Sequence, residues 1–238
     1  MQLARPRLVL DWDGTVTERD MLDLLLEEFG DPALYPRVEA ELDAGRMTLN
    51  EVIAEEFATV NAPLEEVVPR LLERTRVRAG FAEVARAHHP LIVSSGFHEI
   101  IEPVLEREGV RDEVELLANR VDARPDGWVV HFRNGHECGE CGEPCKRADV
   151  EQLKRIDRSV QTGGRAKPAR PETGTASGAF GQDLPEGEVV YAGDGHSDYC
   201  AALAADRVFA TGSLARYLLE RGVPFTPLTD FHALAADL

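Results

Sequence analysis

One stretch near the N-terminus, from Arg7 to Thr17, constrains this chain more than any other part of the sequence. Its apolar run Leu8–Leu10 is hydrophobic at every position, which predicts a strand buried on both faces of a parallel sheet. The run ends in Asp11 and Asp13, which point to the same side of an extended chain. Because ligands bind beyond the carboxyl ends of strands in open α/β sheets, this pair predicts a functional site.

The two carboxylates indicate what this site would bind. Carboxylates held side by side repel each other unless a cation lies between them, and Mg²⁺ prefers oxygen ligands. An ordinary turn, in which the Asp side chains bond to the backbone, is an equally good interpretation of this stretch alone. A calcium loop requires Glu at its twelfth position, and counted from Asp11 that position is Leu22, so a calcium loop is excluded.

Length and composition narrow the class of protein. A chain of 238 residues suits one sizeable domain or a core with an inserted module. A formal net charge of −17 argues against nucleic acid and anionic membranes as partners. The sequence shows neither a signal-peptide pattern nor an apolar run of membrane-spanning length, so we expect neither a signal peptide nor a transmembrane segment. Three of the four cysteines are clustered, so no disulfide framework is predicted and a cytoplasmic location is favoured. No feature points to an oligomeric state.

The segment 17–78 is predicted to be all-helical. Helical apolar spacing runs over 20–29, from 32 or 33 to 44, and over 64–75, and a further helix follows Thr48. Thr48 and Glu51 have the spacing of a capping box. We therefore expect a helical module at 17–78, inserted directly after the first strand into a core made of 1–16 and 79–238.

The remaining chain alternates between strands and helices. Strands are predicted at 90–96, 114–118, 188–192 and 208–210, an antiparallel excursion at 120–132, and helices at 81–88, 98–108, 146–157, 199–205 and 213–221. The stretch 158–187 is rich in Gly, Pro, Ser and Thr and nearly lacks aliphatic residues, so it is predicted to be a mobile surface loop.

Polar side chains follow three of these strands, and one right-handed doubly wound sheet would bring them together. Each also has a purely structural interpretation. Ser94 precedes a helix and could cap it, and Asp198 could be a first-turn acid of the next helix. Gly193–Gly195 could be a plain turn, and Lys146 could be an ordinary surface lysine. Because all of these would have to hold at once, the set as a whole favours a catalytic site.

The same residues resemble a known family. The stretch Asp11–Thr15, Ser94, Lys146, and Gly193–Gly195 with Asp198 resemble the four motifs of the haloacid dehalogenase superfamily, over residues 8 to about 210. The helical insertion and the run after Ser94 are similar to the branch that contains phosphoserine phosphatase. The cysteine-rich stretch before Lys146 is closer to the 2-hydroxy-3-keto-5-methylthiopentenyl-1-phosphate phosphatases of methionine salvage. The resemblance implies a Rossmann-like α/β core with a helical cap.

The resemblance also implies a reaction, the magnesium-dependent hydrolysis of a small phosphorylated metabolite through an aspartyl-phosphate. Asp11 would attack phosphorus, and Asp13 would act as general acid and base. Lys146 would supply positive charge, with Lys154 and Lys167 as rival candidates. The Asp11 carboxylate, the Asp13 carbonyl and Asp194 would bind Mg²⁺. Phosphoserine hydrolysis, or transfer of the phosphoryl group to an acceptor alcohol, is the alternative.

Further residues would complete this site. Ser94, with the Ser95 and Gly96 amides at a helix start, would hold the phosphate oxygens, together with Thr15 of the first motif. Asp198 would orient Lys146 or a metal-bound water.

The clustered cysteines have two interpretations. His136, Cys138, Cys141 and Cys145 offer four soft ligands, with the first two cysteines at zinc-knuckle spacing, so a structural zinc site is one. A cluster of reduced thiols near the active site is the other. Cys200 lies in an apolar helix and is predicted to belong to the core.

The cap sequence bears on the leaving group. A phosphoserine carboxylate would need a buried cation, but the positions after Gly45-Arg46 include the acids Glu55 and Glu56. The sequence therefore favours a phosphate ester with an uncharged tail, held by one or two of the apolar cap residues Leu24, Leu25, Phe29, Leu49, Ile53 and Phe57. Arg19, Arg37 and Arg46 are the cations that could still supply a clamp.

Overall fold

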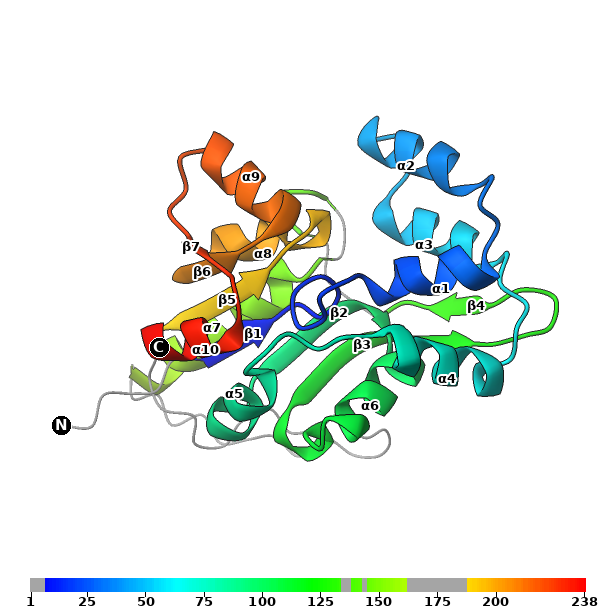
Figure 1. Ribbon diagram of the computed structural model, residues 1–238. Coiled ribbons are helices and arrows are strands. Elements are labelled where there is room, and N and C mark those ends of the chain that lie inside the picture. Colours follow the sequence, from blue (N-terminus) through cyan, green and yellow to red (C-terminus); the bar gives the residue numbers. More distant parts are fainter. Residues whose placement is uncertain (1–6, 134–137, 143–144, 162–187) are drawn as a thin grey trace, which may run out of the picture.

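A seven-stranded sheet with helices on both faces forms the centre of the molecule (Figure 1). The computed structural model describes residues 7–133, 138–142, 145–161 and 188–238. The strand order is β4-β3-β2-β1-β5-β6-β7, and every neighbouring pair is parallel except β3 with β4. The strands are β1 (Arg7–Leu10), β2 (Leu91–Phe97), β3 (Glu115–Asp122), β4 (Val129–His131), β5 (Val189–Gly193), β6 (Arg207–Ala210) and β7 (Thr226–Pro227). The predicted doubly wound α/β fold is confirmed.

The helices lie close to the predicted ranges. They are α1 (Met21–Phe29), α2 (Tyr35–Asp43), α3 (Leu49–Phe57), α4 (Leu64–Arg74), α5 (Phe81–His88), α6 (His98–Arg107), α7 (Arg147–Gln161), α8 (Tyr199–Ala204), α9 (Gly212–Glu220) and α10 (Phe231–Asp237), with short 3-10 turns η1 (Arg111–Glu113) and η2 (His196–Asp198). The predicted capping box of Thr48 and Glu51 begins α3. Within the described chain, no helix combines the length and the apolar character needed to cross a membrane.

The position of β1 decides where the site lies. Val9 pairs with Leu91 of β2 on one side, and Leu10 pairs with Ala192 of β5 on the other. The chain builds β2, β3 and β4 outward on the first side and then crosses to β5 on the second. The ends of β1 and β5 therefore meet at the point where the strand order reverses, which is where open α/β sheets bind their ligands.

The sheet separates two hydrophobic clusters. Leu8 and Leu10 face the cluster that contains the buried residues of α5, α6 and α10, whereas Val9 faces the one under α7, α8 and α9. This follows from the alternation of side chains along a strand, and both faces of β1 are covered, as a continuously apolar strand requires.

The helices of residues 17–78 pack onto the first cluster instead of forming a core of their own. Leu24, Leu25 and Phe57 are fully buried in it. The Phe57 ring meets Phe97 of β2 edge to face, with centroids 4.7 Å apart, and stacks on Trp128 at 6.1 Å. Of this fully described segment, one bridge between Thr17 and Val77 is the only strand-like pairing. The division into core and cap stays a prediction.

Two parts of the chain differ from the sequence analysis. Residues 158–161 continue α7 instead of starting a loop, because the stretch up to Gln161 contains neither Gly nor Pro to end a helix. The rest of the predicted loop, 162–187, lies outside the described residues. The C-terminal β7 and α10 are not anticipated. The two residues of β7 are too few for a periodic pattern, and α10 is held by the Asp230 cap and by buried Phe231 and Leu234.

Candidate active site

The loop after β1 is wound tightly around one carbonyl. The Trp12 oxygen accepts hydrogen bonds from the amides of Val16 at 2.9 Å and Thr17 at 3.0 Å. Gly14 has a φ of +70°, and a Cβ there would lie 2.2 Å from Oδ2 of Asp194. The glycine is therefore required both for the left-handed turn and for the close approach of the Asp194 side chain, which follows β5.

An arginine from the far end of the helical segment locks this loop. The Arg78 guanidinium donates to the carbonyl oxygens of Gly14 and Thr15, both at 2.9 Å. These bonds hold in place the turn that aims Asp11 and Asp13 toward the carboxyl end of the sheet. Sequence reasoning missed Arg78, because nothing local marks an arginine that acts across 63 positions of sequence.

A buried lysine joins two of the predicted aspartates. Asp11 and Lys146 are each 4% exposed, and Nζ of Lys146 donates to Oδ1 of Asp11 and, at 2.7 Å, to Oδ1 of Asp198. Of the rival lysines, Lys154 pairs instead with Asp206 at 2.7 Å. Lys167 lies outside the described residues.

Asp198 acts as the anchor for this lysine. Its side chain is completely buried and accepts hydrogen bonds from the Tyr191 hydroxyl at 2.6 Å and from the amides of Asp194 and Gly195, both at 2.9 Å. Tyr191 was also missed. The available signal was a hydroxyl inside a fully buried strand, since such a group needs a polar partner.

The second predicted aspartate and the strand β2 meet beside Asp11. Oδ1 of Asp13 accepts the Met21 amide at 2.8 Å, and the Ser94 hydroxyl lies 3.4 Å from its Oδ2. The Gly96 amide donates to the Ser94 oxygen at 2.8 Å. The strand predicted at 90–96 and the helix predicted from 98 agree with the structure, in which β2 runs through Ser94–Gly96 to Phe97 and α6 begins at His98. Ser94 does not cap this helix, because the N-cap residue is Phe97, and the Ser95 and Gly96 amides lie at the end of the strand, just before the helix.

Thr15 faces the carboxylates. Its hydroxyl lies 3.2 Å from Oδ2 of Asp11 and 3.5 Å from Oδ1 of Asp194. Asp11, Asp194 and Asp198 carry oxygens that all lie within 4.8 Å of one another. The structure thus brings together the predicted residues of the first motif, Lys146 and the last motif.

The electrostatics of this cluster show an excess of negative charge. Burial, reinforced by the Asp198 carboxylate, raises the pKa of Asp11 to about 6, although Lys146 opposes the shift. Burial and the Asp11 carboxylate raise the pKa of Asp194 to about 8. Burial would also raise the pKa of Asp198, but Lys146 and Tyr191 hold it below its usual range. The single positive charge of Lys146 therefore stabilises the Asp198 carboxylate but does not fully compensate the carboxylates of Asp11 and Asp194.

This deficit fits a divalent cation. The oxygens of Asp198 are already taken by Lys146, Tyr191 and two backbone amides, so Asp11 and Asp194 are the carboxylates with capacity left for a metal. Hard oxygen donors of this kind suit Mg²⁺. The Asp13 side chain is engaged with Met21 and Ser94, which leaves its carbonyl as the predicted third ligand.

Asp13 is suited to carry a proton. Burial, followed by the nearby carboxylates of Asp20 and Asp11, raises its pKa well above the usual range. A carboxyl group with a raised pKa keeps its proton to higher pH and can then donate it, as a general acid must.

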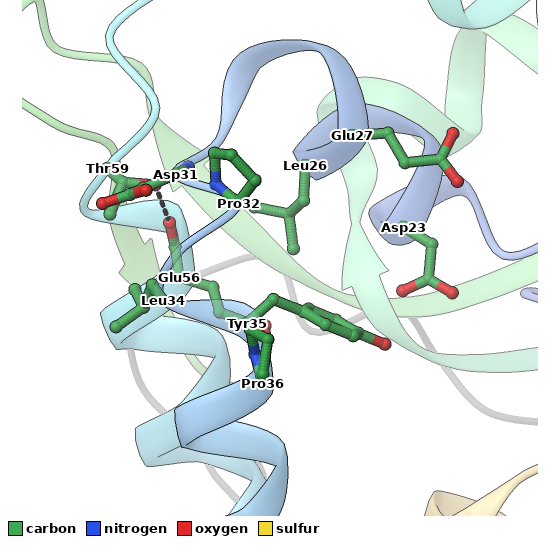
Figure 2. A pocket seen from close by; sticks show the side chains of 10 residues that line it. All are labelled: Asp23, Leu26, Glu27, Asp31, Pro32, Leu34, Tyr35, Pro36, Glu56 and Thr59. Atoms are coloured by element: carbon green, nitrogen blue, oxygen red, sulfur yellow. Dashed lines mark hydrogen bonds between the residues drawn. The ribbon is translucent and has the colours of Figure 1, made fainter.

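A cavity of about 240 Å³ opens above these residues. Its walls come from the aspartates of the core and from α1, α2 and α3, including Leu49 and Ile53. An adjoining pocket of about 260 Å³ shares Asp23, Leu26, Tyr35 and Glu56 with it. Figure 2 shows the side chains of that pocket, which come from α1, α2, the loop between them, the end of α3, and Thr59 just after α3.

The cysteines are only partly where the sequence places them. The structure gathers Cys138, Cys141 and Cys145, whereas His136 lies outside the described residues. Cys200 joins the three instead of belonging to the core, so that expectation is wrong. The reason is that α8 begins at Tyr199, which puts Cys200 in a first turn that faces the segment before α7.

Comparison with known proteins agrees with this geometry. Residues 8–203 match the family model described as haloacid dehalogenase-like hydrolase. Two relatives are named 2-hydroxy-3-keto-5-methylthiopentenyl-1-phosphate phosphatase. The one from Geobacillus kaustophilus is 26% identical and the one from Geobacillus thermodenitrificans 27% identical, each over 94% of this chain and 91% of the relative.

Solved structures show the same fold. A phospho-aspartyl intermediate analogue of phosphoserine phosphatase superposes with a TM-score of 0.63 at 17% identity, covering 99% of each chain. A substrate-bound phosphoserine phosphatase gives a TM-score of 0.62 at 17% identity, covering 98% of this chain and 99% of the other. The resemblance drawn from the motifs is confirmed, as is the prediction of an enzyme. The chain belongs to the haloacid dehalogenase-like hydrolase family.

Proposed function

We propose that this enzyme hydrolyses small-molecule phosphomonoesters, with Asp11 as the nucleophile. The observation that carries the proposal is the buried Asp11 carboxylate, which is bonded to Lys146 on one oxygen and faces Thr15 with the other, beside Asp13 and Asp194. A carboxylate held in this way is preorganised to meet a phosphorus atom in the cavity.

The reaction follows from the neighbours of Asp11. Its carboxylate attacks phosphorus and forms an aspartyl-phosphate, while the bond from phosphorus to the ester oxygen breaks. Asp13, whose pKa burial raises, gives its proton to that departing oxygen. Asp13 then takes a proton from a water molecule that attacks the same phosphorus, so phosphate leaves and Asp11 is regenerated.

Lys146 and a metal ion supply the positive charge that this attack requires. Without them, a carboxylate could hardly approach a phosphate dianion. Asp11, Asp194 and the Asp13 carbonyl would hold Mg²⁺, which when bound neutralises phosphate charge. Asp198 holds Lys146 in position. The Ser94 hydroxyl lies beside Asp13 and Ser95 lines the cavity, and these two residues would bind the phosphate oxygens.

Residues 17–78 would serve as the cap. Helices α1, α2 and α3 contribute most of the cavity wall that faces away from the sheet. Closure of this segment over a substrate would exclude water and select the leaving group.

The cavity favours a leaving group without a carboxylate, as in the substrate named for the Geobacillus relatives. Of the described residues that line it, none is Lys or Arg, and Asp20, Asp23, Glu39 and Glu56 are acidic. The three arginines that could form a clamp are occupied. Arg19 pairs with Glu27, Arg37 with Glu55, and Arg46 with Glu41. We propose an uncharged, sugar-derived or keto-enol tail, which Leu49 and Ile53 could contact.

A screen of phosphate release over many phosphomonoesters tests the function. We expect release from several small esters, and a rate that does not depend on an added acceptor alcohol. Product analysis with and without the acceptor separates hydrolysis from phosphoryl transfer. No release from any ester under saturating Mg²⁺ would refute the proposal.

Metal removal is a second test. Brief EDTA treatment should stop activity and Mg²⁺ should restore it, whereas Ca²⁺ should not, because its looser and higher coordination misplaces the nucleophile. Protons and metal compete for Asp11 and Asp194, whose pKa values are about 6 and about 8, so the Mg²⁺ concentration for half-maximal rate should rise as pH falls. Full activity in excess chelator would contradict the metal requirement.

Glu56 provides a test of the leaving group. It is 8% exposed, lines the cavity, and has a pKa raised to about 7 by burial and by the nearby Asp23 and Asp20 carboxylates. The wild-type enzyme should prefer an ester with an uncharged thioether tail over phosphoserine in kcat/KM. Above pH 7, Glu56→Gln should lower the ratio of kcat/KM for the thioether ester to kcat/KM for phosphoserine by about tenfold, because it removes a charge that repels the phosphoserine carboxylate.

The control for this substitution is Glu66→Gln, an exposed change on α4 away from the cavity, which should leave the preference unchanged. A wild-type preference for phosphoserine would mean that the cap supplies a cation to the carboxylate, and would overturn the assignment of an uncharged tail.

A further inference from the structure

Four cysteines from two separate segments converge beside the active site. Cys138, Cys141 and Cys145 come from the segment before α7, and Cys200 comes from the first turn of α8. Their sulfur atoms all lie within 4.8 Å of one another, and none of the four is in a disulfide. Four sulfurs bound to one zinc ion at about 2.3 Å stand about 3.8 Å apart along the edges of a tetrahedron, so this cluster is within reach of a single ion.

The backbone between Cys138 and Gly142 forms a tight turn around the Cys138 sulfur. The Glu140 amide donates to Sγ of Cys138 at 3.4 Å. The Gly142 amide donates to the Cys138 carbonyl at 2.8 Å, with Gly142 at a φ of +76°. An N–H donor of this kind stabilises a thiolate and helps to orient it as a ligand.

We propose that Cys138, Cys141, Cys145 and Cys200 bind one Zn²⁺ ion as a closed tetrathiolate site. The fourth ligand is thus Cys200, from a helix 55 residues beyond Cys145 by the numbering of the chain, and not His136. Two features favour a metal over disulfides: all four sulfurs are mutually close instead of forming separate pairs, and the Glu140 amide donates to the Cys138 sulfur.

The ion would tie together the two segments that build the catalytic cluster. Cys145 immediately precedes Lys146, and Cys200 follows Asp198 by two positions. Lys146 and Asp198 thus lie next to zinc ligands in the sequence, and they form a buried ion pair at 2.7 Å. Zinc binding would therefore hold Lys146 against its anchor. This consequence rests on the proposed function, but the metal binding itself does not.

The metal content of the full chain tests the proposal. The protein is purified under reducing conditions, its zinc is measured by mass spectrometry of the metal, and Co²⁺ is then exchanged into the site. We expect about one zinc per chain and a cobalt spectrum with intense thiolate charge-transfer bands and tetrahedral ligand-field bands. Neither readout depends on turnover, so a failed phosphatase assay leaves this test intact.

Two substitutions separate the candidate fourth ligands. Cys200→Ser should weaken zinc affinity at least about 100-fold and reduce the charge-transfer intensity, whereas His136→Ala should change neither. Circular dichroism establishes that each variant is folded, and the wild-type cobalt spectrum stands independently of both. Zinc removal by the zinc-selective chelator TPEN, with Mg²⁺ present throughout, keeps this site apart from the magnesium site.

Three results would overturn the proposal. The first is a reduced wild-type protein that contains no zinc and takes up no cobalt. The second is loss of metal in His136→Ala with retention in Cys200→Ser. The third is a metal-free protein whose mass is lower by two hydrogens for each disulfide, which would make the cluster a pair of redox-active cystines.

Discussion

Asp11→Asn is expected to lower turnover at least about 1,000-fold while the protein stays folded, because an amide cannot form the acyl phosphate. The amide oxygen can still accept the hydrogen bond from Lys146, and the side chain keeps its volume in the buried site. Steady-state phosphate release measures the loss. Rapid quenching with a radiolabelled phosphate ester should also label the wild-type protein and leave the variant unlabelled.

The matched control is Asp23→Asn, which changes an exposed aspartate of the same cavity wall that has no contact with Lys146. We expect its turnover to stay within about threefold of wild type. If Asp11→Asn kept activity within a few-fold of wild type, Asp11 would not be the nucleophile and the proposed mechanism would fail.

Lys146→Met is the second change with a large expected effect, and it acts on both stability and rate. It leaves the Asp11 and Asp198 carboxylates buried without their cation, which costs about 3–5 kcal/mol when one partner of a buried ion pair is removed. Turnover should fall at least about 100-fold, since the charge that offsets the approaching phosphate is lost. Chemical denaturation and phosphate release measure the two losses.

The loss of stability should shrink as pH is lowered. In the wild-type protein, Lys146 opposes the burial that raises the pKa values of both aspartates. Without it, both folded-state pKa values rise above their unfolded values, so the folded protein binds more protons and gains stability as pH falls. Denaturation at about pH 8 and about pH 5 should show the larger deficit at the higher pH.

Lys154→Met is the control, because Lys154 pairs with Asp206 at the surface. It should cost no more than about 1 kcal/mol and leave turnover intact. Equal losses in both variants would show that Lys146 has no special place in the site, and a loss of turnover confined to Lys154→Met would reassign the catalytic lysine.

Local patterns were sufficient for most of the fold. The apolar run Leu8–Leu10 predicts a strand covered on both faces. Successive side chains point to opposite faces of the sheet, so a run that is apolar at every position must be shielded from water on both. The helices of 17–78 are predicted by periodicity and by the capping residues Thr48 and Glu51, which act within one turn. The same reasoning places the end of β2 and the start of α6 within one residue of their positions in the structure. It does not fix the residue that caps α6, which is Phe97 and not Ser94.

The carboxylates of the site were predictable for a related reason. Asp11, Asp13 and Asp194 follow buried strands, and the carboxyl ends of parallel strands meet at one edge of the sheet whatever their exact register. The motif therefore implies their proximity as soon as the strands are recognised.

The partners of these carboxylates were decided by tertiary structure alone. Several contacts join segments that lie far apart in the chain. Lys146, and not Lys154, reaches Asp198, which also accepts the Tyr191 hydroxyl. Cys200 lies beside Cys138, and Glu56 of α3 lines the cavity above the aspartates. Sequence by itself determined which elements form and which strand ends carry the candidate site residues, because those features depend on neighbours within a few residues. Which side chains then touch depends on how helices pack across the sheet, and no spacing along the chain encodes that directly.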